Sequence, residues 1–214
     1  MYYITHLHYY LKNPSGFLLG THIVDQQYDD KLRDWLENDY KWKLLYRASE
    51  HRYTGKSFHE YCDDKGPTLI VIKSSGGWIF GGYTTQSWKH INDADSDDNS
   101  LDYYYRLTPN KKDDAKAFIF TLMNPHGVEP TRFMKRKESE YAIKCYPNYG
   151  PIFGYDDITI ANNCSKEDSC WINNNGTNAF KCHPEYKKSL FVNTAKLDHT
   201  NHFSVLDYEV YTHY

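Results

Sequence analysis

Hydrophobic side chains recur along the chain with two different periods, which separate expected helices from expected strands. Residues 25–37 place apolar side chains three or four positions apart, as on one face of a helix. A second, shorter helix is expected from Thr54, a suitable N-cap residue, to Cys62, with Phe58, Tyr61 and Cys62 pointing inward. Residues 42–48 instead alternate, which predicts a strand whose apolar face carries Trp42, Leu44, Tyr46 and Ala48.

Most of the remaining apolar runs are short and predict strands. Residues 68–73 are continuously apolar, and residues 78–84 return after a glycine-rich turn, so the two runs predict an antiparallel hairpin. Inside the returning strand, the pair Gly81-Gly82 indicates a bulge or a backbone approach too close for a Cβ atom. Residues 117–122 predict another strand with a strongly apolar composition.

Three later segments complete the pattern. Residues 89–114 are acidic and polar, and we expect them to form a surface insertion. Residues 161–187 are rich in Asn, Cys and Lys and are expected to form a long loop. A last strand is expected over residues 203–212, with alternate polar side chains such as Glu209 facing water.

The order of these elements predicts the fold class. Short strands follow two early helices without the alternation of strand and helix that builds a parallel sheet. We therefore expect an α+β protein that is predominantly β, in which two antiparallel sheets form a sandwich flanked by short helices. The aromatic content of 17% supports this expectation, because aromatic residues suit pleated, half-buried surfaces.

Charge and hydropathy exclude two classes of partner from the prediction. The 25 basic and 28 acidic residues give a net charge of −3, and the longest basic run is Lys135-Arg136-Lys137, so we predict no nucleic-acid partner. The apolar runs fall far short of the roughly 20 residues of a membrane-spanning helix, so no membrane insertion is predicted. Residues 1–8 lack the pattern of a signal peptide, which predicts a cytoplasmic protein.

The five cysteines are interpreted as reduced thiols, because an odd count leaves one cysteine outside any disulfide framework. One grouping resembles a zinc site and consists of Cys164, Cys170, Cys182 and His183. Its spacing lacks the close C-x2-C pair that preorganises a structural site, so the sequence favours free thiols over zinc. We predict neither a metal nor another cofactor.

Two further motifs imitate ligand-binding loops. Residues 54–57 (Thr-Gly-Lys-Ser) resemble the end of a phosphate-binding loop, but position 50, where that loop needs its first glycine, is Glu50. The acidic run at Asp93, Asp95 and Asp97 resembles the start of a calcium loop. It lacks the glycine at its sixth position and the glutamate at its twelfth, which favours a solvated acidic loop.

Candidate nucleophiles are present without a recognisable catalytic context. Ser49, Ser87 and the cysteines are available, yet neither serine lies in a G-x-S-x-G elbow and no cysteine matches a protease signature. The group Ser49-Glu50-His51 is interpreted as the end of a strand rather than as an acyl-transfer site. The sequence therefore predicts no catalytic residue.

Several separated blocks resemble one known family, the TLDc domain. The blocks are residues 42–51 (WKLLYRASEH), Phe58, residues 66–74, residues 79–84, Ser87-Trp88, residues 117–122, residues 150–154, Asp157-Ile158 and residues 207–210. The resemblance covers residues 19–214 and leaves residues 1–18 as an N-terminal extension. The chain departs from the family at Arg52-Tyr53, where a Gly-Phe pair is usual, and in its long acidic stretch.

The resemblance implies a two-sheet sandwich with no established catalytic centre. It also implies a role in protection against oxidative damage and in binding and regulating the vacuolar proton-pumping ATPase. We therefore expect a non-enzymatic domain that docks on a protein partner. Two other classes stay open: a thiol-dependent antioxidant or hydrolytic enzyme, and a carbohydrate-binding sandwich that stacks sugars on exposed aromatic rings.

Overall fold

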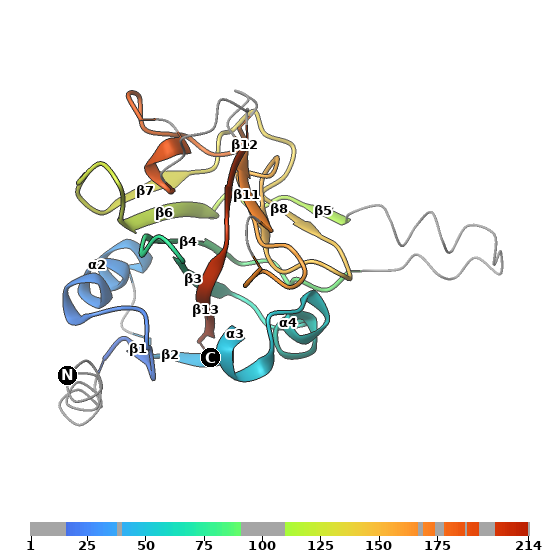
Figure 1. Ribbon diagram of the computed structural model, residues 1–214. Helices are drawn as coiled ribbons and strands as arrows, with labels where there is room; N and C mark the ends of the chain where they lie inside the picture. The colour runs from blue at the N-terminus through green and yellow to red at the C-terminus, as the bar shows by residue number, and fades with distance from the viewer. Residues whose placement is uncertain are drawn as a thin grey trace.

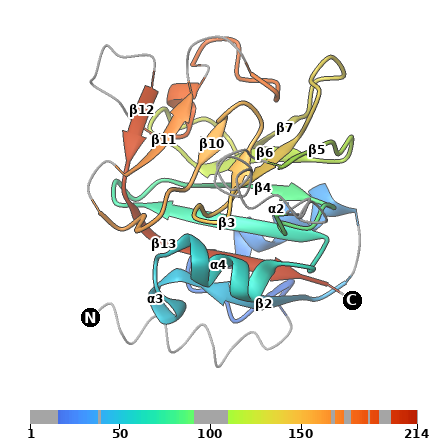
Figure 2. The ribbon, with the colours of Figure 1, turned by 90° about the vertical axis from the view of Figure 1, so that its right-hand side faces the viewer.

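The protein is seen in a computed structural model that describes residues 16–37, 40–90, 110–166, 169–173, 178–186, 188–192 and 200–213. Within these residues the chain forms two sheets that lie face to face, with helices beside the larger one (Figures 1 and 2). The predicted fold class, a mostly β sandwich with few short helices, is confirmed. The predicted calcium-like run at residues 93–97 lies outside the described residues.

The larger sheet has seven strands, and only its outermost pair, β1 and β2, is parallel. In spatial order its strands are β1 (Leu18–Leu19), β2 (Trp42–Arg47), β13 (Val205–Thr212), β3 (Thr68–Ser74), β4 (Ile79–Thr84), β6 (Phe118–Met123) and β7 (Thr131–Met134). The last strand of the chain, β13, thus lies between β2 and β3. The predicted hairpin is confirmed as β3 and β4, which pair from Thr68↔Thr84 to Lys73↔Ile79.

The smaller sheet has six antiparallel strands. In spatial order they are β12 (Thr200–Phe203), β11 (Cys170–Asn173), β10 (Ile158–Thr159), β9 (Ile152–Phe153), β8 (Ile143–Cys145) and β5 (Asn110–Lys112). Two segments that were predicted to lack regular structure each contain a strand. Strand β5 lies in the expected acidic insertion, and β11 lies in the expected loop of residues 161–187. Both strands are short and polar at their ends, so they carried little apolar periodicity.

Three α-helices and one 3-10 turn complete the described fold. They are α2 (Gln26–Leu36), α3 (Ala48–His51), α4 (Gly55–Cys62) and η1 (Lys188–Leu190). Both predicted helices are confirmed, and each begins at a polar capping residue, of which Thr54 was predicted from the sequence. The Asp25 side chain accepts a hydrogen bond from the Tyr28 N–H at 3.1 Å, and the Thr54 side chain accepts one from Ser57 at 3.2 Å.

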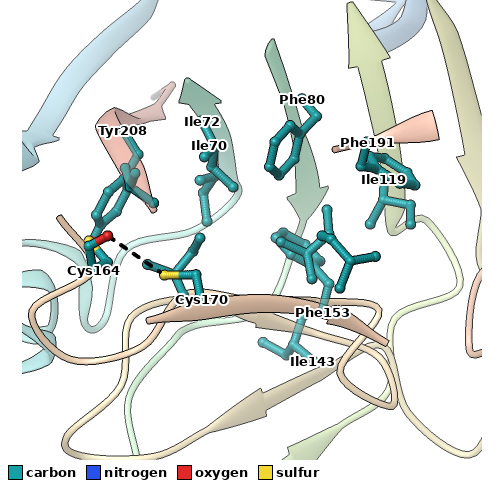
Figure 3. Packing of buried hydrophobic residues seen from close by; sticks show 14 of the residues in the cluster. Ile70, Ile72, Phe80, Ile119, Ile143, Phe153, Cys164, Cys170, Phe191 and Tyr208 are labelled. Atoms are coloured by element: carbon teal, nitrogen blue, oxygen red, sulfur yellow. Dashed lines mark hydrogen bonds between the residues drawn. The ribbon is translucent and has the colours of Figure 1, made fainter. Parts of the chain in front are cut away.

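The main core fills the space between the two sheets. Figure 3 shows Ile70, Ile72 and Phe80 of the larger sheet facing Phe153 and Ile143 of the smaller one. A Cβ atom on Gly82 would lie 2.5 Å from the Phe153 ring, so this glycine lets the sheets approach. The close approach predicted at Gly81-Gly82 is confirmed. A second apolar cluster lies under α2, where Trp35 contacts the Phe120 ring at 5.8 Å.

Two predictions about strand faces are wrong, for related reasons. A register shift between Val210 and Tyr211 of β13 leaves Leu45 of β2 without a direct partner in β13. Trp42 therefore belongs to the cluster under α2, whereas Tyr46 belongs to the core between the sheets. The polar face of β13 is also not solvated around Glu209, because the strand is central and both its faces are covered from Tyr208 to Thr212. Glu209 is completely buried.

Candidate functional site

Two of the sequence motifs, residues 49–51 and residues 54–57, meet at one corner of the fold, formed by α3, the following residues and the start of α4 (Figure 2). We call this surface the α3–α4 corner. It surrounds a hollow of about 370 Å³ lined by Glu50, His51, Arg52, Thr54, Lys56, Ser57, Glu60 and Tyr61. The interpretation of Ser49-Glu50-His51 as the end of a strand is wrong, because β2 ends at Arg47 and residues 48–51 form the short helix α3.

A buried ion pair supports the corner from behind. The Arg47 Nε–H donates to the Glu209 carboxylate at 2.9 Å, and the same guanidinium donates to Glu50 and to the carbonyl oxygen of Gly20. Burial on its own lowers the pKa of the Arg47 guanidinium. The facing Glu209 and Glu50 carboxylates together outweigh this effect, so the pKa is raised overall and the guanidinium stays charged. The pair joins the last strand to the residue that precedes α3.

The Glu209 carboxylate is fully satisfied despite its burial. Besides Arg47, it accepts hydrogen bonds from the Thr21 hydroxyl at 2.8 Å, the His22 backbone N–H at 2.8 Å and the Tyr211 hydroxyl at 2.6 Å. A buried charge with this many donors is stable, and it fixes residues 20–22 against the sheet. The sequence analysis missed this network, because its two charged members are 162 positions apart.

The side chains of Ser49, Glu50 and His51 do not contact one another in the way a catalytic group would, because each has a different side-chain partner. Ser49 donates from its N–H and its hydroxyl to the two oxygens of Asp207, at 3.0 and 2.6 Å. Glu50 pairs with Arg47, and His51 stacks on the Tyr46 ring at 5.6 Å. Ser49 is therefore held by a carboxylate rather than by an imidazole, and the three side chains do not form a catalytic triad.

The His51 ring is held by the backbone of Arg47 and by two aromatic rings. The Arg47 N–H lies 3.1 Å from the His51 Nδ1 atom, and the Arg47 carbonyl oxygen lies 3.0 Å from the same atom. The His51 ring also lies 4.2 Å from the ring of Tyr61. Tyr61 was predicted to point inward, but 38% of it is exposed, so this prediction is wrong and the ring forms part of the surface.

The Thr54-Gly55-Lys56-Ser57 turn uses its donors for the fold. Gly55 donates its N–H to the Asn162 side chain at 3.1 Å, and Ser57 donates its N–H to Thr54. The Ser57 hydroxyl donates to the His51 carbonyl oxygen. With these amides engaged, the turn resembles a capped helix start more than a phosphate cradle, and the exposed Lys56 is left at the surface.

The other candidate nucleophiles also have structural contacts. The Ser87 hydroxyl accepts hydrogen bonds from the N–H groups of Asp64 and Lys89, at 3.0 and 3.1 Å. Cys62 and Cys145 are buried, and burial raises the pKa of both thiols, that of Cys145 to about 12 despite the opposing effect of Lys112. Such thiols hold little thiolate near neutral pH.

The predicted zinc grouping is not brought together. Cys164 and Cys170 are buried side by side in the core (Figure 3), where the Ala161 N–H donates to the Cys170 sulfur at 3.4 Å. Cys182 is only half-buried and stands outside that cluster. Among the residues that the structure describes, no three His, Cys, Asp or Glu side chains could hold a metal ion together.

Half-buried aromatic rings line a hollow at a different place, on the smaller sheet. Tyr146, Tyr149 and Trp171 line a hollow of about 320 Å³ together with the Lys144–Asp156 ion pair. The ring of Tyr149 lies 5.3 Å from that of Tyr146 and 6.2 Å from that of Trp171. Trp35, Trp42 and Trp78 pack against the apolar clusters, as their periodic positions predict.

Comparison with known proteins gives the family. A model of the TLDc domain matches residues 17–214. The chain belongs to the TLDc domain family. The resemblance found in the sequence is thereby confirmed, and the match includes both sheets and the α3–α4 corner. No helix in the described part of this TLDc protein has the length and apolar character needed to cross a membrane.

Similar curated proteins carry the name MTOR-associated protein MEAK7. The chain is 32% identical to the Xenopus laevis protein over 89 residues, which is 40% of this chain and 15% of that protein. It is 34% identical to the Mus musculus protein over the same length and shares, and 38% identical to the Gallus gallus protein over 56 residues, 25% and 11% of the two chains. The alignments thus span about 15% or less of these relatives.

Proposed function

We propose that this chain is a non-enzymatic protein-interaction module of the TLDc type that docks on its partner through the α3–α4 corner. The observation that carries the proposal is that some side chains of the corner make internal hydrogen bonds, whereas others are exposed to solvent. Ser49, His51 and Ser57 are used in internal hydrogen bonds, as described above. Lys56 and Glu60 are exposed around the hollow instead, so the corner offers charges for recognition without a poised nucleophile.

Apolar groups at the same surface support a protein as the partner. Tyr61 is 38% exposed and Leu206 is 55% exposed. Leu206 lies beside the corner, because its carbonyl oxygen accepts a hydrogen bond from the Tyr53 hydroxyl at 2.9 Å. Partly exposed aromatic and aliphatic side chains among charged ones have the composition of a protein interface.

The proposed partner is a subunit of the vacuolar proton-pumping ATPase, and the proposed biological role is support of resistance to oxidative stress in the cytoplasm. Both proposals rest on membership of the TLDc family. The interaction module is proposed to be the span that the family model matches, with residues 1–16 as an extension. This start, earlier than the predicted residue 19, is supported by the pairing of Leu18 with Trp42.

The names of the relatives support a second partner. Because the aligned proteins are described as MTOR-associated, an assembly that contains MTOR is proposed as the alternative target. The two partners are distinguished by one experiment. The intact chain is used as bait in a cell extract at moderate salt, and the recovered proteins are probed for pump subunits and for MTOR.

A matched pair of variants tests the docking surface in the same experiment. Lys56→Glu with Tyr61→Ala changes the corner, and Lys41→Glu with Tyr40→Ala changes one exposed lysine and one exposed tyrosine elsewhere. We expect only the corner variant to lose the partner. Equal recovery by the two variants would contradict docking at this corner, and recovery of neither pump subunits nor MTOR by the wild type would contradict both partners.

A second candidate function, carbohydrate binding, is favoured by the aromatic hollow of Tyr146, Tyr149 and Trp171. Sugars stack on exposed rings and hydrogen-bond to polar groups at the rim, which here include Asn148. A glycan array read with the wild type and with Trp171→Ala tests it. Hits that depend on Trp171 support this function, and an array without hits excludes it.

A further inference from the structure

A third hollow, at the end of β7, has a strongly basic lining. It measures about 610 Å³ and is lined by Asp113, Ala115, Met134, Lys135, Arg136, Lys137, Glu138 and Lys181. Four cations thus face two carboxylates, although the whole chain carries a net charge of −3. We call this surface the basic hollow. It lies at the opposite edge of the larger sheet from β2, far from the α3–α4 corner (Figure 1).

Backbone pairing brings the basic residues together from distant parts of the chain. The Arg136 N–H donates to the Ala179 carbonyl oxygen at 2.8 Å, and the Lys181 N–H donates to that of Met134 at 3.1 Å. Residues 134–136 and 179–181 therefore run side by side. This arrangement adds Lys181 to the short basic run that the sequence showed at residues 135–137.

Not all of these cations are available to a ligand. The Lys135 ammonium group is nearly buried, at 5% side-chain exposure, and contacts Asp113 at 2.9 Å and the Ser139 carbonyl oxygen at 2.6 Å. Arg136 is partly used, since its Nε–H donates to the Phe180 carbonyl oxygen at 3.2 Å. These contacts fix the floor of the hollow and make it largely preformed.

Two lysines carry the unused charge. Lys137 and Lys181 are both exposed, and within the described residues neither ammonium group has a carboxylate partner. The Arg136 guanidinium, 38% exposed, lies near them at 3.5 Å from Glu138. The side chain of Met134 and the methyl group of Ala115 supply apolar surface between the charges.

We propose that the basic hollow binds a short acidic segment of a protein, with two or three carboxylates over Arg136, Lys137 and Lys181 and one apolar side chain over Met134. Charge complementarity defines this occupant. The carboxylates of Asp113 and Glu138 are paired with Lys135 and Arg136, so the remaining positive charge covers a small area that suits a short acidic segment better than an extended anionic membrane surface. A nucleic acid would also need more cations than this hollow offers. The site is separate from the proposed docking corner and does not depend on it.

The probe is a fluorescein-labelled peptide, Ser-Glu-Glu-Leu-Glu-Glu-Ser, and its counterpart with glutamine in place of glutamate. Anisotropy is measured with the full chain at low salt. The wild type is expected to bind the glutamate peptide, to bind it more weakly as salt is added, and to show at least tenfold weaker binding of the glutamine peptide. Equal binding of both peptides, or binding of neither, overturns the proposal.

Two variants of equal net charge locate the site. Lys137→Glu with Lys181→Glu is expected to weaken binding about tenfold or more. Lys41→Glu with Lys65→Glu, which changes two exposed lysines elsewhere, is expected to change it less than threefold. Similar losses in both variants contradict a local site. Phosphatidylserine vesicles and a 20-nucleotide single strand are tested as competitors, and displacement of the peptide by either one at equal charge concentration also contradicts the proposal.

Discussion

The guanidinium of Arg47 and the carboxylate of Glu209 lie 2.9 Å apart in a buried position, although 162 residues separate them in the chain. Arg47 ends β2 immediately before α3, and Glu209 lies in the central strand β13. The pair therefore fixes the α3–α4 corner to the middle of the larger sheet. It also retains Thr21 and His22 through the other hydrogen bonds of Glu209, and Gly20 through Arg47.

Removing one member of this pair is expected to be costly. Arg47→Met leaves the Glu209 carboxylate buried without its counter-charge, which should lower the free energy of unfolding by about 3–5 kcal/mol. Lys89→Met is the control, because it breaks an exposed ion pair with Asp64 of 2.8 Å, which water and salt screen, so its effect on stability should be much smaller. Urea denaturation measures both. Equal costs for the two variants would show that the buried pair does not hold the corner.

Arg52 is expected to be strained. Its φ of 73° lies in a region that glycine adopts far more readily than other residues. The departure from the Gly-Phe pair that is usual in the family thus falls at a position where the backbone favours glycine. Arg52→Gly should raise the free energy of unfolding by about 1 kcal/mol. Thermal unfolding measures this change, and a lower melting temperature than the wild type would contradict the argument.

Gly82 should tolerate no side chain. The Cβ atom of Gly82→Ala would lie 2.5 Å from the Phe153 ring, so the two sheets must move apart, at a cost of about 1–3 kcal/mol. Gly77→Asn is the matched control, since Gly77 has φ of 85°, open space around it and a conformation that asparagine adopts. Chemical denaturation should show a clearly smaller loss for Gly77→Asn. The reverse order is incompatible with the described packing.

Thiol labelling tests whether the cysteines can act as peroxide scavengers. Burial raises the pKa of Cys62 and raises that of Cys145 to about 12, whereas Cys182 is half-buried. In the folded protein at pH 8, a disulfide reagent should react promptly with Cys182 alone, and with all five thiols after unfolding. Prompt reaction of folded Cys182→Ser would instead point to a second accessible thiol and favour the antioxidant enzyme.

The stability of the fold should decrease on mild acidification because of His213. This ring lies 4.7 Å from the rings of both Tyr40 and Trp42, and burial lowers its pKa below 6.5. A histidine with a lowered pKa in the folded state binds its proton more readily in the unfolded chain, so stability is lost as the pH falls below about 6.5. Denaturation of His213→Gln at several pH values should show a flatter dependence than the wild type, and an unchanged slope would exclude this source.

Local signals in the sequence predicted the elements well. The cap at Thr54, the hairpin around Gly76-Gly77 and the close approach at Gly82 all depend on neighbouring residues, and the structure contains each of them. The family was also recognisable, because its blocks are mostly apolar, aromatic or glycine residues that packing and turns require.

Features that depend on distant parts of the chain could not be predicted. The shift of register at Leu45 and the burial of Glu209 both follow from the position of β13 between β2 and β3, which no local period reports. The basic hollow likewise needs the pairing of residues 134–136 with residues 179–181. The sequence placed Glu209 correctly in a strand, but its alternation with apolar residues predicted that the carboxylate faces water, and no local signal indicated its burial.

Site-specific photocrosslinking tests the docking corner most directly. A photoreactive phenylalanine analogue replaces Tyr61 at the corner or, as a control, Asp34 on the exposed side of α2. Irradiated cells are then examined for covalent adducts by mass spectrometry. We expect an adduct with a subunit of the vacuolar proton-pumping ATPase from position 61 and none from position 34. The opposite pattern, or adducts of the same protein from both positions, would contradict docking through the α3–α4 corner.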